Sequence, residues 1–101
     1  MKRHEWLSLV RRTLPGDGVA FLVAYSLAEY ADADLTDNRA FPSILRVSTE
    51  CGLSEAGGRK AIRRLRDRGL LAVTYGPGAG NHYMFRGTPR PVQDPRPRED
   101  A

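Results

Sequence analysis

The sequence predicts one mainly α-helical domain with a small β-hairpin, and three observations lead to this fold class. Apolar residues recur at helical spacing through residues 5–68, where serine caps and glycines separate one helix from the next. Two β-favouring runs, 70–75 and 81–86, flank a glycine-rich segment, which is typical of a hairpin. The last segment, 87–101, has four prolines and one sizeable apolar side chain. With 101 residues in all, we therefore expect a single domain over 1–86 and a disordered Pro/Arg-rich tail over 87–101.

Two helices are expected in the first third of the chain. The grouping of Trp6, Leu9 and Val10 predicts a short helix over residues 5–12, with its apolar side on the body of the protein. A turn follows at 14–18, and Asp17 is a suitable N-cap for a second helix over 19–31. That second helix is apolar on nearly all sides, so we expect it at the centre of the core, with Tyr25 and Tyr30 packed there as well.

Two further helices are expected on either side of a tight turn. After a polar, acidic loop over 32–38, Pro42 favours extended geometry at Phe41, and Ser43 can cap a helix that ends at Gly52. Ser54 can then cap another helix over 55–68, which Gly69 terminates. The spacing of the two helices is typical of a helix-turn-helix arrangement.

The helix predicted over 55–68 has one apolar face and one cationic face. At 100° per residue, the apolar face holds Gly58, Ala61, Ile62 and Leu65, and the opposite face holds Ala56, Lys60, Arg63, Arg64 and Asp67, with Arg59 at its edge. The pair Gly57-Gly58 conflicts with this helix, because each glycine costs about 1 kcal/mol relative to alanine. Either the pair lies inside the helix, or it forms a turn and the helix begins near Arg59.

The net charge of +4 is distributed unevenly along the chain. Residues 39–90 carry ten basic and three acidic side chains, a balance of +7, whereas residues 1–38 carry four basic and six acidic ones, a balance of −2. Such asymmetry is expected of a protein that binds a polyanion, although a solvated basic surface is the alternative.

Several function classes find no support in the sequence. The single cysteine, Cys51, and two histidines, His4 and His82, give no metal-ligand spacing, so we expect no metal and no cofactor. The carboxylates of the loop 32–38 have no apolar surroundings to raise a pKa, and no phosphate-binding glycine motif is present, so we expect no enzyme. The chain has no apolar run of membrane-spanning length and no signal-peptide pattern, which predicts a cytoplasmic location.

Four short motifs together resemble the winged helix-turn-helix DNA-binding domains of bacterial and phage regulators and replication initiators. They are Phe41-Pro42-Ser43, the run 48–54 that ends in Gly-Leu-Ser, the Ala-Ile-Arg-Arg-Leu of 61–65, and Gly69-Leu70-Leu71. The likeness covers about residues 5–86. It departs from the family at Gly57-Gly58, where a Thr-Val pair is usual, at Ala56, where a basic residue often reads bases, and at Leu45, where a polar residue is common.

The resemblance implies a protein that binds double-stranded DNA, as a transcriptional regulator or as an accessory factor in replication or recombination. The second helix of the motif would enter the major groove, and the hairpin would contact phosphates or the minor groove. The residues implied as DNA contacts are Ser43, Ser54, Ala56, Arg59, Lys60, Arg63, Arg64, Asn81, His82 and Arg86. A hairpin loop with no DNA contact is the alternative for the last three residues.

A second hypothesis is a protein-interaction module that binds or inhibits a partner protein. Acidic Glu55, the glycine pair and Leu45 favour this hypothesis, while the +7 segment favours DNA binding. A homodimer is compatible with either hypothesis, and the sequence does not decide the oligomeric state.

Overall fold

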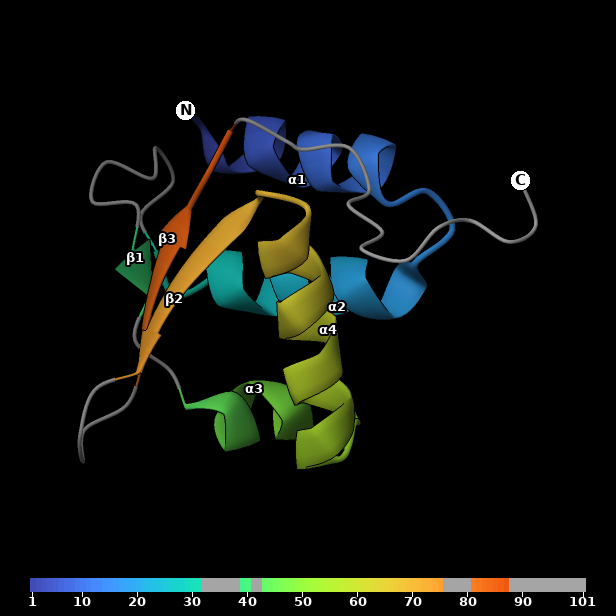
Figure 1. Cartoon of the computed structure of the whole chain (residues 1–101), viewed down its shortest axis with the longest axis vertical. Helices are drawn as coiled ribbons and strands as arrows, with labels where there is room; N and C mark the ends of the chain where they lie inside the picture. Colours follow the sequence, from blue (N-terminus) through green and yellow to red (C-terminus); the bar gives the residue numbers. More distant parts are fainter. Residues whose placement is uncertain (32–38, 41–42, 76–80, 88–101) are drawn as a thin grey trace, which may run out of the picture.

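Four helices and three strands make up the part of the chain that the computed structural model describes, residues 1–31, 39–40, 43–75 and 81–87. In chain order they are α1 (Arg3–Thr13), α2 (Gly18–Ala28), β1 (Arg39–Ala40), α3 (Ile44–Glu50), α4 (Glu55–Asp67), β2 (Leu71–Tyr75) and β3 (Asn81–Phe85) (Figure 1). The prediction of a mainly helical chain with a small antiparallel sheet is confirmed. The predicted acidic loop, the geometry of Phe41 and Pro42, the glycine-rich turn 76–80 and the tail from residue 88 lie outside the described residues.

The helix boundaries follow the local signals in the sequence. Asp17 caps α2 by accepting a hydrogen bond from the Ala20 amide at 3.0 Å. Ser43 and Ser54 cap α3 and α4 in the same way, each accepting from the amide three residues later at 3.1 Å. The left-handed backbone at Gly52 and Gly69, with φ of 72° and 76°, ends the helices where the sequence predicts.

The sheet has one more strand than the sequence predicts. Its order is β1-β3-β2, and both pairings are antiparallel. The strand β1 has only two residues, Arg39 and Ala40, which pair with Met84 and Tyr83 of β3. A strand of two residues is too short to show the alternation of apolar and polar side chains by which strands are predicted. It forms because these residues pair with the free edge of β3.

Trp6 joins α1 to the base of the two longer strands. Its side chain is fully buried, and its indole N–H donates to the carbonyl oxygens of Leu70 at 3.0 Å and Arg86 at 3.1 Å. Its ring meets Phe85 edge to face, with the ring centroids 4.7 Å apart. The backbone of Arg86 also donates to the Leu70 carbonyl at 2.9 Å. These contacts place α1 over the end of the sheet where β2 begins and β3 ends.

The glycine pair lies inside α4, which begins at Glu55. Gly58 is buried against Ser48 of α3, and a Cβ atom at position 58 would lie 1.8 Å from the Ser48 Oγ. The glycine is therefore required by the close approach of the two helices, and not by a turn. Of the two alternatives, the full-length helix is the correct one.

The prediction that α2 is buried on nearly all sides is wrong. Ala20, Val23, Ala24, Leu27 and Ala28 are buried, but the opposite face is open to solvent. Val19, Leu22 and Tyr25 on that face are 41%, 45% and 47% exposed, and Tyr30, just beyond the helix, is 38% exposed. The helix also ends at Ala28, three residues earlier than predicted.

Candidate nucleic-acid interface

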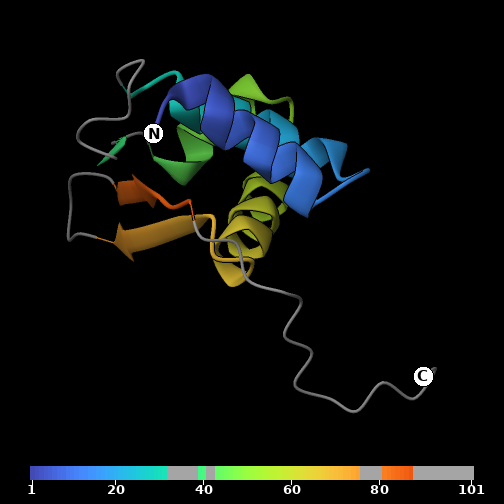
Figure 2. The same cartoon turned by 90° about the horizontal axis from the view of Figure 1, so that it is seen from above.

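The outer face of α4 is the most cationic surface that the sequence predicts, and the structure leaves it open to solvent. Gly58, Ala61, Ile62 and Leu65 are buried beneath it, as predicted. In the view of Figure 2, α4 and β2 lie below α1. The exposed side chains of α4 are Glu55, Ala56, Arg59, Lys60, Arg63, Arg66 and Asp67. Among the described residues, these side chains are accessible to a ligand.

Lys60 and Arg63 are the available cations at the centre of this face. They are three residues apart, so they are neighbours on the helix surface. Within the described part of the chain, neither makes an ion pair or a hydrogen bond. Arg59, by contrast, is paired with Glu55 at 2.7 Å, and the i, i+4 spacing of these two residues could have predicted that pair. Lys60 and Arg63 thus carry the uncompensated charge of the helix.

Arg64 is held by an acidic residue from another helix. Its Nε donates to one carboxylate oxygen of Asp17 at 2.7 Å, and a terminal nitrogen donates to the other at 3.1 Å. The hydrogen bond from Arg64, helped by the one from the Ala20 amide, lowers the pKa of Asp17 below its ordinary value of 3.8. Asp17 therefore caps α2 and also links α2 to α4 through its ion pair with Arg64. Because the two residues are 47 positions apart, no local pattern predicts the pair.

We expect Asp17→Ala to lower the free energy of unfolding by about 1–3 kcal/mol at pH 7, because it removes a helix cap and a charge-assisted pair. The folded-state pKa of Asp17 lies below the unfolded one, so its stabilisation is complete above pH 3.8 and is lost as the pH falls through the folded pKa. Urea unfolding of the wild type and of Asp17→Ala checks this, because the difference in their free energies of unfolding should be smaller at pH 2.5 than at pH 7. Asp67→Ala, whose side chain is 62% exposed, is the control and should change stability by less than about 0.5 kcal/mol.

The other predicted contacts are not all close to these cations. Ser43 and Ser54 are exposed, and their hydroxyls cap α3 and α4. Asn81 and His82 lie at the start of β3, but their side chains are outside the described residues. Arg86 is exposed at the other end of β3, where its backbone pairs with Leu70 just after α4. The structure therefore separates Arg86 from the capping serines by the length of α4 (Figure 1).

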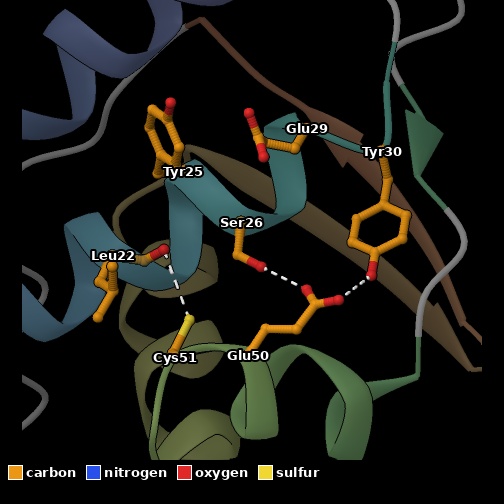
Figure 3. A pocket seen from close by; sticks show the side chains of 7 residues that line it. All are labelled: Leu22, Tyr25, Ser26, Glu29, Tyr30, Glu50 and Cys51. Atoms are coloured by element: carbon orange, nitrogen blue, oxygen red, sulfur yellow. Dashed lines mark hydrogen bonds between the residues drawn. The ribbon is translucent and has the colours of Figure 1, made fainter.

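A hollow of about 470 Å³ lies between α2 and the end of α3, and no sequence pattern indicates it. Glu50 of α3 accepts hydrogen bonds there from the Tyr30 hydroxyl at 2.6 Å and from the Ser26 hydroxyl at 3.0 Å (Figure 3). These bonds, the one from Tyr30 above all, lower the pKa of Glu50. Burial raises the pKa of the neighbouring Cys51 thiol, which points toward the Leu22 carbonyl oxygen. This polar cluster joins α3 to α2.

No protein-family model, no curated protein and no solved structure matches this chain. Among the described residues, no group of three or more His, Cys, Asp and Glu side chains could hold a metal ion. None of the described helices is long and apolar enough to span a membrane.

Proposed function

We propose that this protein binds double-stranded DNA as a winged helix-turn-helix domain, with α3 and α4 as the helix-turn-helix and with β2 and β3 as the wing. The observation that carries the proposal is the pair Lys60 and Arg63, two cations without partners among the described residues, at the centre of the open face of a helix. The +7 balance of residues 39–90 adds a long-range attraction for a polyanion.

The proposed roles of the two cations follow from their side-chain chemistry. The major groove is about 12 Å wide and admits one α-helix. Arg63 can donate two parallel hydrogen bonds to the acceptor edge of a guanine, while Lys60 neutralises a phosphate. Arg59 and Arg64 would have to leave their carboxylate partners before binding DNA, so we assign them smaller contributions.

The biological role that we propose is transcriptional regulation, or an accessory part in replication or recombination. A domain of this kind acts by occupying DNA, and its cationic helix would supply the affinity. The alternative, protein binding, is favoured by Leu45 on α3, which is 57% exposed. A protein that bound only another protein would show no salt-dependent affinity for duplex DNA.

We expect duplex binding whose log K falls linearly with log salt, with a slope of about −0.9 for each phosphate contacted. Lys60→Ala should weaken binding to every sequence and reduce the slope by about 1, whereas Arg63→Ala should relax preference at one base position by about 1–3 kcal/mol. Fluorescence anisotropy at several salt concentrations, with random duplexes and with selected sites, measures both effects.

Arg12→Ala is the matched control, because Arg12 is an exposed arginine on a different helix, α1, where its side chain donates a hydrogen bond to the Ser8 carbonyl oxygen. It removes the same charge and should leave the salt slope and the base preference nearly unchanged. Absence of duplex binding at low salt would reject the proposed function. Equal effects of Arg63→Ala and Arg12→Ala on the salt slope and on the base preference would instead show that α4 is not part of the DNA interface.

A further inference from the structure

The open face of α2 presents three large apolar side chains to solvent. We call Val19, Leu22 and Tyr25 the α2 stripe; they are 41%, 45% and 47% exposed. Soluble monomers expose single apolar residues commonly, but a row of them along one helix is typical of an interaction surface. The hollow beside α3 continues the surface next to Leu22 and Tyr25 (Figure 3).

The chemistry of this face favours a second copy of the same chain. Between the cap Asp17 and Glu29, α2 has no charged residue, so two such faces can meet without burying an unpaired charge. Two identical helix faces also form a closed contact when a two-fold axis relates them. An axis near Leu22, with the two helices antiparallel, would place Tyr25 of each copy against Val19 of the other.

The charges at the two ends of α2 fit the antiparallel arrangement. Glu29 lies seven residues after Leu22, about 10 Å along the helix axis. At the opposite end of α2, before Leu22, Arg11 lines a depression together with Leu14, Asp17 and Phe21. Arg11 and Glu29 are exposed, and within the described residues neither has a charged partner. In the antiparallel pair, each Glu29 would lie at the end of the interface where the other copy carries Arg11.

We propose that the α2 stripe is the interface of a homodimer in which two α2 helices pack antiparallel about a two-fold axis near Leu22. The buried side of α2 packs on α4, so this interface faces away from α4 and leaves the cationic helix open. The inference does not require DNA binding.

Sedimentation velocity of the full chain without DNA, from about 10 μM to 1 mM, tests the proposal, because a dimer populates with concentration. We expect a reversible monomer–dimer equilibrium that Leu22→Arg weakens by about tenfold or more. Leu45→Arg is the matched control, since Leu45 is the more exposed leucine and lies on α3. It should leave the equilibrium within about twofold of the wild type. Circular dichroism of both variants checks that they fold.

A charge exchange tests the antiparallel arrangement. Glu29→Arg and Arg11→Glu should each weaken the dimer, and the double variant should restore it, because the pair is then formed with its signs reversed. A wild type that stays monomeric at 1 mM, or equal effects of Leu22→Arg and Leu45→Arg, would overturn the proposal. Failure of the double variant to restore the dimer would overturn the antiparallel arrangement. Since no DNA is present, neither result bears on the proposed function.

Discussion

Gly58→Ala is expected to lower the free energy of unfolding by about 2–3 kcal/mol, although glycine is the poorer helix former. The new methyl group would lie 1.8 Å from the Ser48 Oγ and 2.9 Å from its Cβ. Rotation of the Ser48 hydroxyl removes only the first contact, and it breaks the 2.7 Å hydrogen bond to the Ile44 carbonyl oxygen. The helices α3 and α4 must therefore move apart, which urea unfolding measures as a loss of stability.

A compensating change at position 48 makes this prediction specific. The double variant Ser48→Gly/Gly58→Ala has no Oγ or Cβ atom at position 48. The nearest atom of residue 48 to the new methyl group is then its Cα, at 3.4 Å, so we expect most of the lost stability to be recovered. The coupling energy between the two positions should be about 2 kcal/mol. Gly57→Ala is the control: its Cβ would meet only Leu53 and the exposed Ser54 hydroxyl, the nearer at 3.3 Å. This change should stabilise the protein by up to about 0.5 kcal/mol. Additive effects at positions 48 and 58 would contradict the explanation.

Trp6→Ala has the largest expected effect, a loss of about 3–5 kcal/mol. The substitution empties a fully buried site beside Phe85 and removes the donor that the carbonyl oxygens of Leu70 and Arg86 share. A domain of this size has a total stability of only about 5–10 kcal/mol. We therefore expect the variant to lose about half of the stability of the domain, which urea unfolding followed by far-ultraviolet circular dichroism measures.

Trp6→Phe separates the packing of this side chain from its hydrogen bonds. Phenylalanine keeps an aromatic ring at the site but donates no hydrogen bond, so we expect a smaller loss, of about 1–3 kcal/mol. Leu45→Ala, at a side chain 57% exposed, should stay within about 0.5 kcal/mol of the wild type. A loss below 1 kcal/mol for Trp6→Ala would show that α1 does not hold the base of the sheet.

Local features of this fold could be read from the sequence. The caps Asp17, Ser43 and Ser54 and the stops Gly52 and Gly69 all lie where they were predicted. They could be found because a cap or a left-handed glycine acts within one turn of its own helix. The two faces of α4 were equally predictable, since its apolar residues repeat at the helical period.

The sequence was less informative where a residue depends on distant neighbours. An apolar helix such as α2 carries no periodic signal, so its composition did not reveal that Val19, Leu22 and Tyr25 face solvent. The sequence predicted several cations on α4, but it did not predict which of them would be paired with a carboxylate. Asp17 pairs with Arg64 because the fold brings the start of α2 to α4.

By itself the sequence thus determined the helices, their caps, the glycine stops after α3 and α4 and the cationic face of α4, because capping and periodicity act over a few residues. The tertiary structure decided which surfaces are covered and which charges are free. It makes β1 from two residues beside β3, it requires Gly58 opposite Ser48, and it leaves Lys60 and Arg63 without partners among the described residues. These outcomes depend on contacts between segments far apart in the chain, whose geometry is fixed only when the core packs.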